Sequence, residues 1–216
     1  MDLPKIKDLI SCGDPEYLES LFRQLLRSGF SSSGVFIEDL TPQEALNIGK
    51  RQGPRDSTRA VACKDSKVSF WYAMEVDKSP REETRTGACG DPHFAQRYAL
   101  MLDEGPHAST RLAACETTYY AYQYARYVDK GPREDTRQAA CGSSLYAFLY
   151  ARDVDKGPRE DTRRAACGDP HYAFQYAFQV DKGFQEETWG SVQGTTWGNR
   201  YRTQFGSGKQ RHLSQT

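Results

Sequence analysis

The chain has 216 residues, with 29 basic and 29 acidic side chains and a formal net charge of zero at pH 7. This balance argues against tight, nonspecific binding of nucleic acid by the molecule as a whole. No apolar run approaches the roughly 20 residues that span a bilayer, and the first residues lack the layout of a signal peptide, so the sequence predicts a soluble, cytoplasmic protein with no membrane segment.

Residues 1–52 are expected to form diverged capping hairpins. The sequence C-G-D-P-E-Y at residues 12–17 closely matches C-G-D-P-H-Y at residues 167–172, which predicts an N-terminal helical hairpin over residues 6–26. A second, more diverged hairpin is marked by T-P-Q-E-A at residues 41–45. Terminal units of a repeat array commonly diverge in this way because they cap the stack.

Residues 53–188 contain five copies of a 26-residue repeat and a truncated sixth copy. The copies begin at Gly53, Ser79, Gly105, Gly131, Gly157 and Gly183. In the fourth copy, Pro132 is expected to be the first residue of a helix of about ten residues, which we call helix A. Glu134 and Asp135 fall in the first turn of this helix, where negative charge is favourable.

A second helix, helix B, is predicted to follow in each copy. The residue before it is an N-cap type throughout, namely Asp65, Asp91, Thr117, Ser143 and Asp169. Its apolar residues in the fourth copy cluster on one side at 3.6 residues per turn, and they are Tyr146, Ala147, Tyr150, Ala151 and Val154. We expect Gly157, which tolerates positive φ, and the following Pro158 to end the helix. Helices this short are not stable alone, so the hairpins must stack into an α-solenoid.

Residues 189–216 change in character, with five glycines, Trp189, Trp197 and four basic residues but no acidic one. This composition predicts a flexible, basic C-terminal tail that joins no periodic apolar face.

From Asp169 to Gly183 the chain reads D-P-x-Y-A-x-x-Y-A-x-x-V-x-K-G. It thereby resembles short helical-repeat proteins of bacteriophages and some bacteria, over roughly residues 6–188. The resemblance implies a helical-repeat architecture and a phage or bacterial accessory protein, and it carries over no catalytic residue. The T-R and A-A-C sequences in helix A depart from it.

Five of the six cysteines stand 26 residues apart, at positions 63, 89, 115, 141 and 167. Equivalent residues of stacked hairpins lie about 8 to 10 Å apart, beyond the roughly 7 Å limit for a disulfide. The spacing therefore predicts reduced, buried cysteines with a structural role.

Two charged rows repeat with the same period. Thr-Arg recurs from Thr58-Arg59 to Thr162-Arg163, and an aspartate recurs at the end of helix B from Asp77 to Asp181. Arginine–aspartate pairing between the rows is the favoured interpretation, and an anion track for phosphates is the alternative. The repeated tyrosines, from Tyr72 to Tyr176, are likewise interpreted as core, with a platform for nucleic-acid bases as the alternative.

Helix-B positions that differ between copies are unexpectedly apolar or basic, and we predict that they bind a partner. They are Phe70, Trp71, Arg97, Tyr119, Tyr122, Arg126, Tyr127, Phe148, Leu149, Arg152, Phe174 and Phe178. A recognition surface needs such individuality, whereas a stacked core favours uniform residues. The alternative is that these side chains form a second packing layer between neighbouring copies.

No constellation of residues points to catalysis, a metal or a cofactor. The four histidines do not recur with a nucleophile, and G-S-G-K at residues 206–209 lacks the first glycine of a phosphate-binding loop. The sequence thus favours a non-enzymatic binding protein with a protein partner, with inhibition of a host factor as one expected use. The alternative is a nucleic-acid or nucleotide binder that uses the arginine row and the basic tail.

Overall fold

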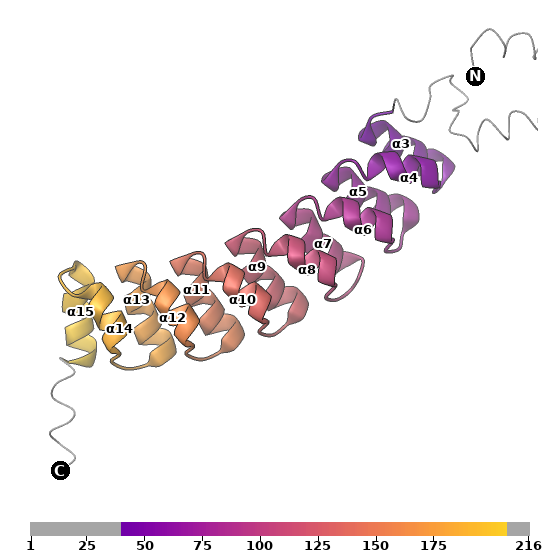
Figure 1. Ribbon diagram of the computed structural model, residues 1–216. Coiled ribbons are helices and arrows are strands. Elements are labelled where there is room, and N and C mark those ends of the chain that lie inside the picture. The colour runs from indigo at the N-terminus through magenta and orange to yellow at the C-terminus, as the bar shows by residue number, and fades with distance from the viewer. Residues whose placement is uncertain (1–39, 207–216) are drawn as a thin grey trace, which may run out of the picture.

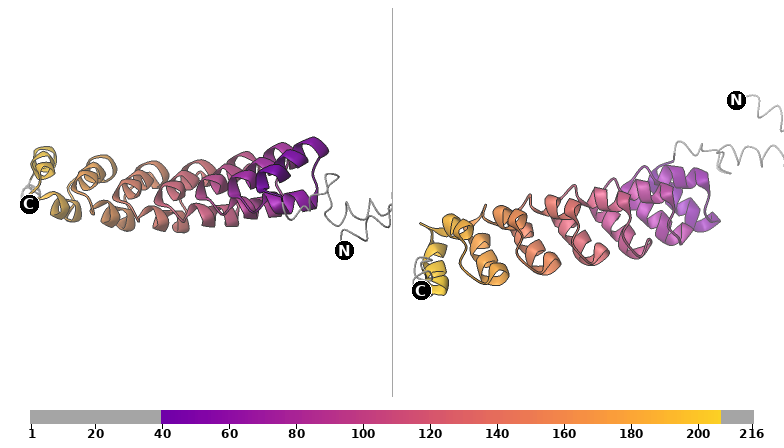
Figure 2. Two further views of the ribbon diagram at one scale, coloured as in Figure 1. Left: turned by 90° about the horizontal axis from the view of Figure 1, so that it is seen from above. Right: turned by 60° about the horizontal axis from the view of Figure 1, so that its bottom comes forward.

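The computed structural model describes residues 40–206, and over this range it is all-helical with no strand. The helices stack pairwise, in sequence order, into a long and gently curved rod with the first and the last of the described helices at opposite ends (Figure 1). Two further views show the same succession of pairs (Figure 2). The predicted α-solenoid is confirmed. The hairpin predicted at residues 6–26 lies outside the described residues, as do residues 207–216.

Each repeat contributes one helix A and one helix B. The A helices are α4 (Asp56–Ala62), α6 (Glu82–Ala88), α8 (Ala108–Ala114), α10 (Glu134–Ala140), α12 (Glu160–Ala166) and α14 (Glu186–Val192). The B helices are α5 (Ser66–Tyr72), α7 (Pro92–Met101), α9 (Thr118–Tyr124), α11 (Ser144–Tyr150), α13 (Pro170–Tyr176) and α15 (Thr196–Phe205), and α3 (Pro42–Gln52) packs before α4. Four B helices continue as wider π-helical turns, η2 (Ala73–Asp77), η3 (Ala125–Asp129), η4 (Ala151–Asp155) and η5 (Ala177–Asp181). We number the repeats 1 to 6 from Gly53.

The predicted N-caps of helix B are confirmed in four of the five regular repeats. The side chains of Asp65, Asp91, Thr117 and Asp169 accept hydrogen bonds from backbone N–H groups of the first turn, whereas Ser143 makes no such bond. These caps satisfy donors that have no partner within the helix.

The predicted start of helix A at proline is wrong. In repeat 4 helix A has only seven residues and begins at Glu134, with Arg133 as an extended N-cap residue at φ −132°. Arg133 stays extended because both of its backbone groups bind the hydroxyl of Tyr150, the N–H at 3.0 Å and the carbonyl at 3.0 Å. Pro132 therefore precedes the cap.

Positive φ at the end of helix B also falls one residue earlier than predicted. Lys78, Glu104, Lys130, Lys156 and Lys182 have φ between 52° and 55°, and the following residues do not. In repeat 4 the N–H of Gly157 reaches back to the carbonyl of Ala151 at 3.1 Å, which closes the widened last turn. This closure places the left-handed backbone conformation at Lys156, and Gly157 does not adopt it.

The tyrosine–alanine face forms the core, as predicted. Tyr72, Tyr98, Tyr124, Tyr150 and Tyr176 are completely buried. Each hydroxyl lies 2.7 to 2.9 Å from the hydroxyl of a buried threonine in helix A of the same repeat, for example Thr136 for Tyr150. One hydroxyl thus ties helix B to the N-terminus of helix A in every repeat, and the interpretation as a base-stacking platform is excluded for these rings.

The predicted flexible tail is wrong for residues 189–206. Helices α14 and α15 continue the stack, and Val192, Tyr201 and Phe205 pack on Ala173 and Ala177 of repeat 5. Tyr201 and Thr188 repeat the core tyrosine–threonine pair at 2.8 Å, with a sequence separation of 13 residues in place of 14. This missing residue shifts the apolar pattern out of step with the other repeats and hid the sixth hairpin.

The five cysteines of the described region are free, as predicted, but they are half-buried and not fully buried. They occupy the C-cap of helix A in repeats 1 to 5. Burial is the largest cause that raises the pKa of Cys115, Cys141 and Cys167 from 9.0 to about 11. The native fold therefore favours the protonated thiols. Cys12 lies outside the described residues.

We expect these thiols to react slowly with iodoacetamide in the folded protein. At pH 8 a thiol of pKa about 11 carries on the order of 100-fold less thiolate than one of pKa 9, and the thiolate is the reactive form. Mass-spectrometric labelling rates in buffer and in urea measure the difference. Equal rates for Cys141 in the two conditions would contradict it.

Candidate recognition surface

The structure divides the twelve predicted partner-binding residues into an inner and an outer row. Phe70, Tyr122 and Phe148 are buried, with 0 to 4 % of their surface exposed, and Phe174 at the equivalent position is half-buried. These four form the inner row. The prediction that they contact a partner is wrong for the three buried rings, which have no surface for one to reach.

The inner row is buried because it packs against the next repeat. The ring of Tyr122 stacks on Tyr146 with centroids 6.0 Å apart, and Phe148 stacks on Tyr172 at 6.4 Å. Phe148 also packs in a cluster with Ala166 of the next helix A. The alternative interpretation, a second packing layer between neighbouring copies, therefore holds for this row.

The remaining eight predicted residues form the outer row. Trp71, Arg97 and Leu149 are half-buried, and Tyr119, Arg126, Tyr127, Arg152 and Phe178 are exposed. Tyr119, Tyr127 and Phe178 expose 43 to 46 % of their surface. Contiguous exposed apolar patches on a protein commonly mark a site of contact.

Two further residues of this surface, Leu100 and Met101, were not predicted from the sequence. They expose 42 % and 47 % of their surface. They lie in repeat 2 at the positions that Arg126 and Tyr127 occupy in repeat 3, so the 26-residue spacing could have found them. We define the helix-B face as the outer row plus these two: Trp71, Arg97, Leu100, Met101, Tyr119, Arg126, Tyr127, Leu149, Arg152 and Phe178.

Arginines of the helix-B face lie over aromatic rings of the inner and outer rows. The guanidinium of Arg97 is 4.9 Å from the ring centre of Phe70 and 5.7 Å from that of Trp71, both in the preceding repeat. Arg126 lies 5.3 Å from Tyr127, and Arg152 lies 5.1 Å from Phe148. These cation–π contacts spread positive charge over apolar surface, a combination common in protein-binding sites.

One carboxylate joins repeats 3 and 4 on this face. Asp153 Oδ2 accepts hydrogen bonds from Tyr122 Oη at 2.6 Å and from Arg126 Nη1 at 2.8 Å. Arg152 Nε also donates to Asp153 Oδ1, at 2.7 Å. The hydrogen bond from Arg152 is the largest of the causes that lower the pKa of Asp153, and burial is the largest cause that raises the pKa of Tyr122 to about 12.

The arginine row of helix A lies away from this face and is paired. Arg59, Arg85, Arg111, Arg137 and Arg163 bind the aspartate at the end of helix B in their own repeat, with Nη2–Oδ1 distances of 2.6 to 2.8 Å. Their side chains are 7 to 18 % exposed, and those of the aspartates 0 to 7 %. The predicted arginine–aspartate pairing is confirmed.

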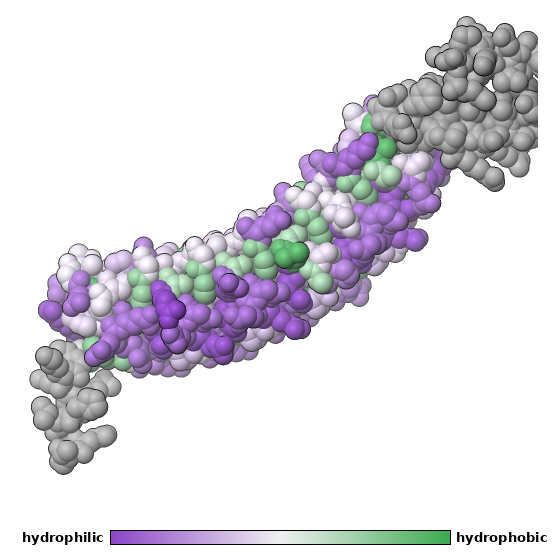
Figure 3. Space-filling view, in the orientation of Figure 1, coloured by the Kyte–Doolittle hydropathy of each residue, from purple (hydrophilic) through white to green (hydrophobic). Residues whose placement is uncertain are grey.

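The surface seen in the orientation of Figure 1 carries a narrow, weakly hydrophobic band that runs lengthwise between hydrophilic regions (Figure 3). In the described part of the chain the most exposed large apolar residue is Leu112, at 73 %, which belongs to helix A and lies outside the helix-B face. Between residues 40 and 206 no helix is long and apolar enough to cross a membrane, and no cluster of three His, Cys, Asp or Glu side chains is placed to hold a metal ion.

The fold and this surface define a helical-repeat protein with one distinctive exposed face. Comparison with known proteins finds no matching family model, curated protein or solved structure. The resemblance to short phage and bacterial helical-repeat proteins therefore stays a prediction.

Proposed function

We propose that this chain is a non-enzymatic helical-repeat binding protein whose helix-B face engages a protein partner. The observation that carries the proposal is the exposure of Leu100, Met101, Tyr127 and Phe178, each between 42 and 47 %, on a face that the stacked core does not require. Exposed apolar side chains of this size gain free energy when a partner covers them.

The composition of the face supports a protein partner. Aromatic residues, methionine and arginine are enriched in protein–protein interfaces, and they carry much of the binding energy there. The uniform core tyrosines contrast with the position just before them in helix B, which successive repeats fill with Trp71, Arg97, Gln123, Leu149 and Gln175. Such variation lets each repeat make a different contact with a protein partner.

The nucleic-acid alternative has less support. The predicted anion track is occupied by aspartates of the same repeats, as described above. In the predicted basic tail, Arg200 and Arg202 lie over the rings of Trp197 and Trp189, 4.7 and 5.1 Å from their centres, and Lys209 and Arg211 lie outside the described residues.

A bacterial or phage-infected cytoplasm is the setting that the sequence resemblance implies. In that setting the simplest mechanism is occlusion, in which the rod covers an active or assembly surface of a host protein. This mechanism needs no catalytic group on the chain, only a face long enough to contact several sites on the partner.

Capture from a bacterial lysate on the immobilised chain tests the proposal. We expect a protein retained by the wild type to be lost with the triple variant Leu100→Ser, Tyr127→Ser and Phe178→Ser, because these changes remove the exposed apolar anchors. Melting temperature should change little, since all three side chains are exposed.

Leu112→Ser is the matched control, because it removes an even more exposed apolar side chain from helix A. Capture that survives the triple variant but is lost with Leu112→Ser would place the binding surface on helix A. Capture that disappears after nuclease treatment would favour the nucleic-acid alternative.

A further inference from the structure

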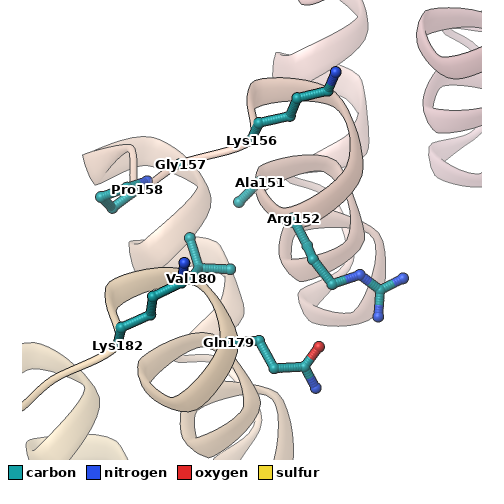
Figure 4. A pocket seen from close by; sticks show the side chains of 8 residues that line it. All are labelled: Ala151, Arg152, Lys156, Gly157, Pro158, Gln179, Val180 and Lys182. Carbon is teal, nitrogen blue, oxygen red and sulfur yellow. The ribbon is translucent and has the colours of Figure 1, made fainter.

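A pocket of about 340 Å³ lies between repeats 4 and 5, where the first residues of η4 and the loop after it face η5 (Figure 4). Its lining residues are Ala151, Arg152, Lys156, Gly157, Pro158, Gln179, Val180 and Lys182. Three of them are cationic and none is acidic. Phe178, the residue before Gln179 in the chain, is an exposed ring of the helix-B face.

The cationic side chains surround the pocket in different ways. Lys182 extends toward Val180, whereas the ends of Arg152 and Lys156 lie at the rim and point outward (Figure 4). Arg152 and Lys156 are exposed residues on long, flexible stems. Their charged ends can therefore turn toward an anion that enters the pocket.

The junction between repeats 3 and 4 shows what occupies the corresponding place one repeat earlier. There Asp153 stands where repeat 5 has Gln179, and Arg126 stands where repeat 4 has Arg152. The Asp153 carboxylate accepts from Arg126 of the preceding repeat at 2.8 Å and from the Tyr122 hydroxyl at 2.6 Å. The chain thus binds its own carboxylate across this junction.

The junction between repeats 4 and 5 has the cations without that carboxylate. Gln179 donates its amide to Gln175 of its own helix at 2.6 Å. Arg152 shares Asp153 with Arg126, so two guanidinium groups have one carboxylate between them. With Lys156 and Lys182 added, the pocket retains positive charge that an anion can neutralise.

We infer that this pocket is a carboxylate-binding subsite, which receives an aspartate or glutamate side chain of the protein partner next to an apolar contact on Phe178. The inference rests on the proposed function only in naming a protein as the source of the carboxylate. The intramolecular precedent at Asp153 favours a carboxylate over a phosphate.

Two-dimensional NMR of the ¹⁵N-labelled full chain tests the subsite with defined probes. We expect N-acetyl-phenylalanyl-aspartic acid amide to shift the backbone amides of Lys156, Gly157 and Lys182 saturably, with a dissociation constant on the order of 10 mM. The asparagine counterpart, which has the same shape without the charge, should bind about tenfold more weakly or not at all.

Gln179→Asp is the decisive variant, because it installs the carboxylate that repeat 4 carries at the equivalent position. It should abolish the response to the aspartate peptide, whereas Gln138→Asp, which makes the same charge change on helix A, should leave the response intact. Equal responses to the two peptides, or a response unchanged in Gln179→Asp, would overturn the subsite.

Stronger saturation by phenyl phosphate than by the aspartate peptide would overturn the assignment to a carboxylate and point to phosphate. These titrations need no captured partner, so the subsite can fail while the helix-B face still binds a protein. Conversely, the immobilised wild-type chain can fail to capture any protein while the aspartate peptide still binds in this pocket.

Discussion

Replacing Tyr124 by alanine is expected to lower the free energy of unfolding by about 3–5 kcal/mol. The Tyr124 side chain is completely buried. Its hydroxyl lies 2.8 Å from that of Thr110 and accepts a hydrogen bond from the backbone N–H of His107 at 3.0 Å. The substitution leaves both a cavity and unpaired polar groups in helix A of the same repeat. Urea unfolding followed by far-UV circular dichroism measures the loss.

Tyr127→Ala and Tyr122→Ala are the exposed and the buried control for this prediction. Tyr127 is 45 % exposed, so its removal should change the unfolding free energy by no more than about 0.5 kcal/mol. Tyr122 is only 3 % exposed and should behave like Tyr124. A loss for Tyr127→Ala as large as that for Tyr124→Ala would contradict the assignment of core and face.

Arg137→Met is expected to destabilise the fold by about 3–5 kcal/mol, because it leaves a buried charge without its partner. Asp155 is 4 % exposed and is held by Arg137 Nη2 at 2.8 Å. Melting temperature and urea midpoint measure the effect. The double variant Arg137→Met and Asp155→Asn removes the uncompensated charge and should recover part of the loss.

Arg164→Met is the control for the removal of an arginine. Its partner is Glu160, and both side chains are largely exposed, at 69 % and 77 %, so the change should cost no more than about 1 kcal/mol. If Arg137→Met costs as little as Arg164→Met, then the buried arginine–aspartate pairs contribute little to holding helix A against the end of helix B in each repeat.

The 26-residue repeat explains why the architecture could be predicted from sequence. Tyr150 recurs in all five regular repeats and Val154 in four of them, with Leu102 in repeat 2. Because their spacing is helical, they mark one side of helix B as core, and both are buried. The arginine–aspartate pairs were predictable for a similar reason, since two oppositely charged rows with the same period face one another in a stacked array.

Phe148 shows where this reasoning fails. It lies two residues after Tyr146, outside the single apolar stripe, and a helix with one buried side would expose it. Helix B is instead packed between two neighbouring repeats, so it buries a second side against Tyr172 and Ala166. The sequence alone does not show which residues pack on helix B, so it does not distinguish the buried Phe148 from an exposed residue such as Tyr127.

Other details depend on contacts that no local pattern reveals. In repeat 1 a serine, Ser69, replaces the alanine that the other regular repeats carry, and repeat 2 has Gly87 where its neighbours carry valine or alanine. A Cβ atom on Gly87 would lie 2.4 Å from Ser69 Oγ, so the two departures from the repeat accommodate each other. Only the packed structure shows this pairing.

Hydrogen exchange of the chain with and without its captured partner tests the central claim most directly. If the helix-B face is the recognition surface, amide protection on binding should appear at the ends of the B helices, at residues 71–78, 97–104, 123–130, 149–156 and 175–182, with helix α8 (Ala108–Ala114) unchanged. Protection confined to helix α8 and the other A helices, with the ends of the B helices unchanged, would contradict it.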